Sequence, residues 1–402
     1  MKKPALHWQI LIALVLAVLF GMYAKDYVPW VSWMGEVFLR ALKMIIIPLI
    51  FSSLVAGVVN IGSASNLGRL GFKTIIYYVT TSTFAILTGL FFVNLIQPGI
   101  GADLNLAREV EGIAGHQPLS RTLIELIPEN IFAAFTRSDM LSIIFFAMLF
   151  GFFSTRVKTR FKNTISDFFN AVFEVMMQVT HFVILFTPLG IFGIVAEVVS
   201  EQKDLLALVQ SMGKYMGVVL LGLSLHAFIT LPLLLRLIGK VNPLKHFRAL
   251  TTPLLTAFST SSSGATLPLT MDAVEHKSGV SPKITSFTLP LGATINMDGT
   301  ALYECVVAMF IAQAYGVDLS ITQQAVVVLT ALLASIGAAG IPMAGLVMIS
   351  VVLTAVGLPL EGVGLVLAVD RILDMFRTAT NVWSDSCGAV IIARSEGEKL
   401  KV

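Results

Sequence analysis

Long apolar runs alternate with short polar stretches along the whole chain. A helix needs about 20 mostly apolar residues to cross the hydrocarbon core of a bilayer. Eight runs approach or exceed this length and predict membrane-spanning helices at 6–25, 34–60, 74–97, 139–155, 167–198, 206–236, 283–313 and 362–393. The first run has no clear small-residue cleavage site, so it predicts a retained helix and not a signal peptide. The polar region 98–138 receives no assignment, and the charged segment 157–168 predicts a cytoplasmic connection.

Two further apolar runs, 244–275 and 322–356, are interrupted by small and polar residues at 259–264 and 337–345. Each half is too short to cross a bilayer. Non-helical backbone survives at membrane depth only inside protein or beside a water-filled cavity. Paired interruptions in corresponding halves of a chain indicate inverted repeats with a binding site between them. We therefore expect two re-entrant helical hairpins whose tips meet near the midplane. The alternative is two ordinary spans with flexible kinks.

The composition agrees with a chain that is embedded in a bilayer. The sequence is 56% hydrophobic and only 13% charged, whereas soluble domains carry roughly 25% charged residues. With the N-terminus in the cytoplasm and the hairpins opening to opposite sides, the inside loops hold seventeen Lys and Arg residues against five outside, as the positive-inside rule requires. The prediction is an all-α polytopic membrane protein with eight transmembrane helices and two oppositely oriented re-entrant hairpins. It would lie in the cell (inner or plasma) membrane with both termini cytoplasmic.

Composition also excludes several partners. No basic patch with interleaved aromatic residues indicates a nucleic acid. Cys305 and Cys387 lie in apolar segments without metal-ligand or disulfide-framework spacing, so we expect both to be packing residues.

The last apolar run carries a stripe of charged and amide side chains: Asp370, Asp374, Arg377, Asn381 and Asp385. Successive helix residues turn by about 100°, which places all five within an arc of roughly 100°. A charge at mid-bilayer costs about 2.5 kcal/mol or more, so these groups must pair with each other, with ions or with a ligand. Three carboxylates against one arginine leave an excess of negative charge that suits bound cations. The alternative is a self-satisfied ion-pair network that joins helices.

The pentapeptide 296–300, Asn-Met-Asp-Gly-Thr, lies inside the run 283–313. Asn, Asp and Gly are poor helix formers, so we expect the helix to open there. Opening exposes backbone carbonyls beside the Asp298 carboxylate and the Thr300 hydroxyl. Hard cations prefer such oxygen ligands, so this pentapeptide predicts a cation site.

An enzyme is a weaker interpretation. The serines at 261–263 have no GxSxG elbow around them, and His276 is the only histidine nearby in sequence. The GxGD signature of intramembrane aspartyl proteases is absent from the sequence. The sequence therefore does not predict an enzyme or a cofactor.

Four segments together resemble the dicarboxylate/amino acid:cation symporter family, whose best-known members are glutamate and aspartate transporters. They are SSSGATLP at 261–268, LPLGATINMDGTALYE at 289–304, SIGAAGIP at 335–342 and DRILDMFRTATN at 370–381. The resemblance covers most of the chain and is densest from 244 to 393.

The resemblance implies that an acidic amino acid binds between the two hairpin tips. Arg377 would hold the side-chain carboxylate through its planar guanidinium. Asp374 would hold the amino group, which favours an amino acid over a plain dicarboxylate such as succinate. The whole implied set is Arg377, Asp374, Thr378, Asn381, Thr300, Ser261, Ser262, Ser263, Ile341 and Gly345.

The resemblance also implies sodium as a co-substrate at three places. One set is Asp385, Asn381, Gly292 and Asn296, and a second is Asp298, Asn296, Thr81, Ser82 and Tyr78. A third is Thr294 with the carbonyls of Ser335, Ile336 and Ala338, and Met297 adds a further candidate ligand. Glu304 stands where some relatives carry a titrating glutamate linked to proton movement, so it is a proton-coupling candidate or a fixed hydrogen-bonding group. Potassium counter-transport also stays open.

Family members are implied to be homotrimers that work by an elevator motion. Residues 1–73 and 120–240 would be mainly scaffold, and 74–97 with 241–394 mainly the mobile transport domain. The resulting hypothesis is sodium-coupled uptake of glutamate or aspartate. The alternatives are a proton-coupled glutamate or C4-dicarboxylate symporter, and an anion channel. The sequence indicates no role for Asp370 beyond charge balance.

Overall fold

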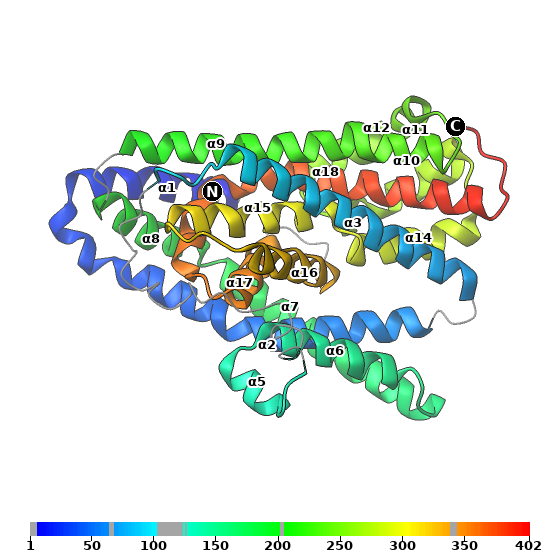
Figure 1. Ribbon diagram of the computed structural model, residues 1–402, viewed down its shortest axis with the longest axis horizontal. Coiled ribbons are helices and arrows are strands. Elements are labelled where there is room, and N and C mark those ends of the chain that lie inside the picture. The colour runs from blue at the N-terminus through cyan, green and yellow to red at the C-terminus, as the bar shows by residue number, and fades with distance from the viewer. Residues whose placement is uncertain (1–5, 64–67, 103–123, 125–126, 202–204, 338–343) are drawn as a thin grey trace, which may run out of the picture.

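The described residues of the computed structural model, 6–63, 68–102, 124, 127–201, 205–337 and 344–402, fold into helices joined by loops, with no strand among them. Most long helices run along the long axis of the molecule (Figure 1). They include α1 (Leu6–Tyr23), α2 (Ser32–Ser63), α3 (Gly68–Ile96), α9 (Leu205–Leu225) and α18 (Val363–Ser395). Helix α15 (Asp298–Ala314) lies at the centre and contacts α3, α9 and α18. This placement buries the residues that follow the predicted helix opening.

Several predicted spans match single helices or runs of consecutive helices. Among the described residues, four helices are long and apolar enough to cross a bilayer, or five if one bent pair forms a single span. The four are Ser32–Val59, Arg69–Ile96, Leu206–Leu237 and Pro282–Ala314. The helices α1 and α6 (Met140–Ser154), predicted as spans 6–25 and 139–155, are shorter, with 18 and 15 residues. Helix α18 has 33 residues and carries the charged stripe, which lowers its apolar character.

The run 167–198, predicted as one span, is bent. It consists of two helices, α7 (Thr159–Ile184) and α8 (Thr187–Glu201), with a bend of 53° between them. Pro188 explains the break, because proline lacks the N–H that would continue the helix. The expected connection 157–168 is also helical from Thr159 onward, since its Lys, Arg and Phe residues tolerate a helix.

The first of the two predicted interruptions coincides with a helix break, and the second lies largely outside the described residues. In the run 244–275, α11 (Pro243–Ala249) and α12 (Thr251–Thr260) precede α13 (Ser263–Asp272). In the run 322–356, α16 (Ile321–Gly337) and α17 (Ala344–Ala355) contact each other. The span 283–313 opens as predicted, because α14 (Pro282–Ile295) ends before Asn296 and α15 starts at Asp298.

Smaller elements complete the chain. A 3₁₀ helix at Lys25–Trp30 links α1 to α2, α5 (Ile131–Arg137) precedes α6, and a 3₁₀ turn at Leu360–Gly362 precedes α18. Two π-helical turns also occur: η4 (His226–Thr230) joins α9 to α10 (Leu231–Leu237), and η5 (Ala273–Ser278) follows α13. The unassigned region 98–138 lies partly outside the described residues.

One end of the molecule gathers segments predicted to be cytoplasmic. Lys73 at the start of α3 bonds to Glu396 after α18, with a distance of 2.6 Å from Nζ to Oε1. The backbone N–H of Lys401 donates to the carbonyl of Ser278 at 3.0 Å. These contacts bring three of the expected inside segments together.

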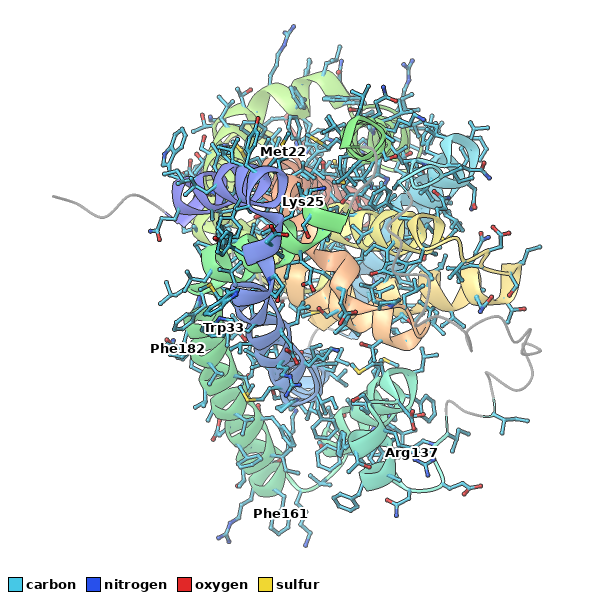
Figure 2. The ribbon with its side chains drawn as sticks, turned by 90° about the vertical axis from the view of Figure 1, so that its left-hand side faces the viewer. Met22, Lys25, Trp33, Arg137, Phe161 and Phe182 are labelled. Atoms are coloured by element: carbon cyan, nitrogen blue, oxygen red, sulfur yellow. The ribbon has the colours of Figure 1, made fainter. Side chains whose placement is uncertain are left out.

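The outer surface is rich in large apolar side chains. Trp33, Phe161 and Phe182 are 55%, 57% and 61% exposed, and Figure 2 shows them on the outside of α2 and α7. Extensive exposed apolar surface marks a membrane or protein contact. The surface therefore agrees with a bilayer-embedded protein.

Candidate substrate and cation site

Arg377 lies at the centre of the buried polar face of α18. Its guanidinium is 1% exposed, and its Nη2 lies 2.8 Å from Asp374 Oδ1 and 3.0 Å from Asp370 Oδ1. Its Cζ lies 3.9 Å from the centroid of the Tyr303 ring on α15, within the range of a cation–π contact. Nε and Nη1 find no hydrogen-bond partner among the described residues. The carboxylates therefore fix the guanidinium at Nη2, and the N–H groups of Nε and Nη1 remain available to a ligand.

Asp370 has a defined place in this cluster. The Tyr303 hydroxyl donates to Asp370 Oδ1 at 2.6 Å, and the same oxygen faces Arg377. Arg371, one residue further along α18, lies 3.7 Å from Asp374 Oδ2 and is partly exposed. Asp370 is thus a buried counter-ion of Arg377, which gives the charge balance expected of Asp370 a specific partner.

Both predicted hairpins contribute buried residues to the interior. Ser261 adopts the left-handed conformation (φ 51°), is 2% exposed, and its hydroxyl has no partner among the described residues. Ser262 caps α13 by accepting from the N–H of Ala265 at 3.2 Å, and Ser263 is buried. In the second predicted hairpin, a Cβ at Gly345 would lie 2.5 Å from Arg377 Nη1, so only glycine lets α17 approach the guanidinium this closely.

Asn381 joins α18 to the start of α15. Its side-chain oxygen accepts from the N–H of Gly299 at 2.7 Å, and its amide donates to the Thr300 hydroxyl at 3.2 Å. Thr378 is buried one turn after Asp374 on the same helix. The structure therefore brings the predicted groups of α18 and Thr300 together.

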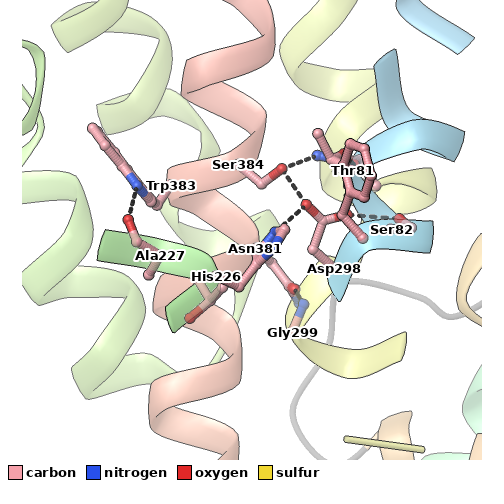
Figure 3. A network of polar contacts seen from close by, with 12 residues as sticks. Thr81, Ser82, His226, Ala227, Asp298, Gly299, Asn381, Trp383 and Ser384 are labelled. Carbon is pink, nitrogen blue, oxygen red and sulfur yellow. Dashed lines mark hydrogen bonds and ion pairs between the residues drawn. The ribbon is translucent and has the colours of Figure 1, made fainter. Parts of the chain in front are cut away.

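Asp298 is fully buried at the junction of four elements (Figure 3). Its Oδ1 accepts from Ser82 Oγ at 2.6 Å and lies 3.3 Å from Thr81 Oγ1. Its Oδ2 accepts from Ser384 Oγ at 2.6 Å and lies 3.0 Å from His226 Nε2. Both carboxylate oxygens are therefore oriented by neighbouring side chains.

Several oxygens gather around the Thr81 hydroxyl. Besides Asp298, the Thr81 hydroxyl lies 3.3 Å from Asn296 Oδ1, 3.2 Å from the carbonyl of Tyr78 and 3.1 Å from that of Tyr77. One hydroxyl hydrogen can serve only one of these acceptors at full strength. Hydroxyls, carbonyls and a carboxylate are the ligands of hard cations, so this cluster has the chemistry of a cation site.

The predicted set around Asp385 also comes together in part. Asn296 Nδ2 donates to Asp385 Oδ1 at 2.8 Å and to Ser384 Oγ at 3.0 Å. A Cβ at Gly292 would lie 2.5 Å from Asp385 Oδ1, which brings the backbone of α14 against this carboxylate. The Tyr78 hydroxyl instead donates to the carbonyl of Thr288 at 2.6 Å, so only its own carbonyl faces Thr81.

The third predicted cation set lies partly outside the described residues and stays a prediction. Thr294 is exposed and bonds to the carbonyl of Leu291 at 3.0 Å, and Ser335 bonds to that of Leu332 at 2.8 Å. Helices α14 and α16, which carry Thr294, Ser335 and Ile336, do contact each other. Ala338 and Ile341 lie outside the described residues. Met297 is buried, and its carbonyl accepts from the N–H of Ala301 at 2.8 Å.

Glu304 is fully buried in α15, and neither carboxyl oxygen has a hydrogen-bond partner among the described residues. It follows Tyr303, whose ring lies under Arg377. A buried carboxyl without partners is costly in its charged form, so this position favours a protonated side chain.

Sequence reasoning missed three members of the site: Tyr303, Ser384 and His226. Tyr303 lies three residues after Thr300 on α15 and Ser384 three residues after Asn381 on α18, so helical spacing could have suggested them. His226 is a single histidine in an apolar run, six residues before Pro232, and that pair is the only signal the sequence contains.

Comparison with known proteins decides the family. A family model described as the sodium:dicarboxylate symporter family matches residues 6–395. The chain belongs to the sodium:dicarboxylate symporter family. It is therefore a membrane transport protein and not an enzyme, which confirms the resemblance noted from the motifs.

Individual relatives of this sodium:dicarboxylate symporter family chain span bacteria and animals. The proton/sodium-glutamate symport protein of Geobacillus stearothermophilus is 36% identical over 99% of this chain and 96% of its own length. The proton/glutamate-aspartate symporter of Escherichia coli is 36% identical over 98% of this chain and 93% of its own. Excitatory amino acid transporter 3 of Mus musculus is 34% identical over 98% and 87%, respectively.

Proposed function

We propose that this protein takes up an acidic amino acid, glutamate or aspartate, by symport with sodium ions. The observation that carries the proposal is the pairing of Arg377 with Asp374. Both side chains are buried, and the arginine keeps unpartnered donors on the side that faces Gly345. An α-amino acid with an acidic side chain presents the complementary charges.

Each end of the substrate has a partner in this proposal. Charge-assisted hydrogen bonds from Arg377 would hold the side-chain carboxylate. Asp374 would hold the amino group. A C4-dicarboxylate has no amino group, so it offers no ammonium for the Asp374 carboxylate to bind. The amides at the start of α13, next to Ser262, suit the main-chain carboxylate because helix N-termini favour anions.

Sodium would bind as a co-substrate at the Thr81–Asp298 cluster and beside Asp385. Support comes from the acceptors gathered around Thr81 Oγ1 and from Asn296, which lies 3.3 Å from Thr81 Oγ1 and donates to Asp385 Oδ1 at 2.8 Å. Each sodium ion carries a charge across the membrane potential, which contributes about 2.3 kcal/mol per 100 mV. Several coupled ions would therefore drive steep accumulation.

The proposed transport motion divides the chain into a moving part and a fixed part. Residues 74–97 and 241–394 would move as a transport domain against a scaffold formed by 1–73 and 120–240 in a homotrimer. Both hairpins would be re-entrant and open to opposite sides, with the termini in the cytoplasm. The second hairpin would close over bound substrate, and the site would then slide across the membrane in an elevator motion.

One observation favours a second candidate, a proton-coupled glutamate or C4-dicarboxylate symporter. Glu304 has both carboxyl oxygens buried and unpartnered among the described residues. A carboxyl that exchanges a proton between two states of the transporter would replace or supplement a sodium ion. In that case Glu304→Gln would remove the pH dependence of uptake, and an unchanged pH dependence would exclude this role.

The deciding experiment is uptake into liposomes that contain the purified protein. Labelled aspartate, glutamate and succinate are compared while sodium, proton and potassium gradients are varied separately. We expect aspartate or glutamate uptake to need an inward sodium gradient and succinate uptake to be weak. Uptake that ignores sodium would refute the proposal, and uptake driven by protons alone would establish the second candidate.

A further inference from the structure

A π-helical turn interrupts the helix that leads from α9 to α10. The N–H of Leu231 bonds to the carbonyl of His226, five residues earlier, and not to that of Ala227. Pro232 explains the wider turn, because a proline inside a helix lacks an N–H and its ring clashes with the carbonyl four residues before it. Single π turns of this kind are frequent at functional sites.

The turn is attached to α18 by a side chain. The carbonyl of Ala227, which the wider turn leaves without its usual helical partner, accepts from the indole Nε1 of Trp383 at 2.9 Å. Trp383 directly precedes Ser384, whose hydroxyl bonds to Asp298. Figure 3 shows the π turn and α18 converging on Asp298 from the same side.

His226 is the residue that the π turn directs at Asp298. The ring is fully buried, and its Nε2 lies 3.0 Å from Asp298 Oδ2. Its Nδ1 has no hydrogen-bond partner among the described residues. A neutral ring with its hydrogen on Nε2 fits this arrangement, because Nε2 then donates to the carboxylate and only a lone pair is left without a partner.

The contacts divide the carboxylate into two halves. Oδ2 faces His226 and Ser384, whereas Oδ1 faces Thr81 and Ser82 on α3. The hydroxyls and carbonyls of the candidate cation cluster lie only on the Oδ1 side. A donor on Oδ2 fixes the rotation of the carboxylate and adds a hydrogen bond to its charged form.

We propose that His226 is a positioning residue of the Asp298 cation site, holding Oδ2 so that Oδ1 is presented to a sodium ion among Thr81, Ser82 and Asn296. The inference rests on the proposed sodium symport. It adds a residue on a separate helix that does not touch the ion or the substrate. The π turn and the Trp383 contact then serve to aim the imidazole.

The test compares three substitutions at one position. Gln places an amide nitrogen the same number of bonds from Cα as Nε2, Asn is one carbon shorter, and Leu keeps bulk without a donor. A hydrogen bond to a charged group contributes about 1.5–3 kcal/mol, which corresponds to about 10- to 100-fold in an equilibrium constant. We therefore expect His226→Leu and His226→Asn to raise the sodium concentration for half-maximal aspartate uptake by about tenfold or more. His226→Gln should stay within about threefold of the wild type.

The measurement is a sodium titration of aspartate uptake and a separate aspartate titration at saturating sodium. Positioning predicts that the aspartate half-saturation of His226→Leu returns near the wild-type value once sodium is saturating. Equal sodium dependence in all variants would overturn the inference, and so would a loss of maximal uptake with unchanged sodium dependence. The wild-type titration tests the proposed function separately, because sodium-independent wild-type uptake would refute symport before any variant is considered.

Discussion

Removing Arg377 tests the substrate assignment most directly, but the simple alanine variant is ambiguous. Arg377 makes two buried ion pairs, of 2.8 Å to Asp374 and 3.0 Å to Asp370. Removing one partner of a buried pair costs about 3–5 kcal/mol, because a charge stays buried without compensation. Total stability is often only about 5–15 kcal/mol. Arg377→Ala would therefore lose uptake through unfolding as well as through lost binding.

A charge-balanced double variant separates these effects. Arg377→Gln combined with Asp370→Asn removes one positive and one negative charge from the same cluster. Tyr303 can still donate to the new amide oxygen, and Arg371 remains beside Asp374. Two lost charge-assisted hydrogen bonds to a substrate carboxylate amount to at least about 3 kcal/mol. This loss weakens aspartate binding more than about 100-fold.

The assay is aspartate binding to the purified protein by isothermal titration calorimetry at saturating sodium, with size-exclusion chromatography to verify intact assembly. Arg371→Gln is the matched control, because it removes the same charge from the same helix at a partly exposed position, 3.7 Å from Asp374. We expect the control to bind aspartate within about tenfold of the wild type, since exposed ion pairs contribute about 0–1 kcal/mol. A well-assembled double variant that binds aspartate as tightly as the control would show that Arg377 does not hold the substrate carboxylate.

Two further predictions concern the hairpin and the C-terminal segment. Gly345→Ala places a Cβ 2.5 Å from Arg377 Nη1, so we expect at least about tenfold weaker aspartate binding in the same calorimetric assay, whereas Gly213→Ala, with no atom within 4 Å of its added Cβ, should bind normally. Hydrogen bonds and charges from Arg69 and Lys73 lower the pKa of Glu396 from 4.5 to about 2. The stabilisation that the charged Glu396 gives to this contact is therefore fully present above about pH 4.5 and is lost as the pH falls through about 2. Protease cleavage after residue 395 should stay equally slow from pH 5 to pH 8 in the wild type and be faster in Glu396→Gln; a cleavage rate that rises between pH 8 and pH 5 would contradict the reasoning.

Local sequence chemistry predicted the helix breaks well. Asn296 and Asp298 are poor helix formers inside an apolar run, and the chain leaves the helix between them. The serines at 261–263 combine a left-handed residue with an N-cap, which are local properties of short polar side chains. The bend after Ile184 was missed although Pro188 marks it, because the apolar pattern continues across the break and pattern alone does not detect a change of axis.

Contacts between distant segments were predictable only where the resemblance supplied them. The spacing along α18 placed Asp370 and Arg377 on one face, which the ion pair confirms. No spacing rule, however, joins His226 to Asp298, because the contact depends on a π turn and on the packing of α9 against α15. Partners of this kind are set by tertiary packing, and a periodicity argument cannot reach them.

Asn296 gives the two candidate cation positions a physical connection. Its Oδ1 lies 3.3 Å from Thr81 Oγ1, and its Nδ2 donates to Asp385 Oδ1 at 2.8 Å. The side-chain amide of Asn296 is planar and rigid. An ion that draws the Asn296 Oδ1 toward Thr81 must therefore also move the Asn296 amide hydrogen that Asp385 accepts. Binding at one position therefore changes the hydrogen bonding at the other, and by linkage the effect is reciprocal. If sodium binds at both positions, it should bind cooperatively, with Asn296 as the residue whose replacement separates the two events.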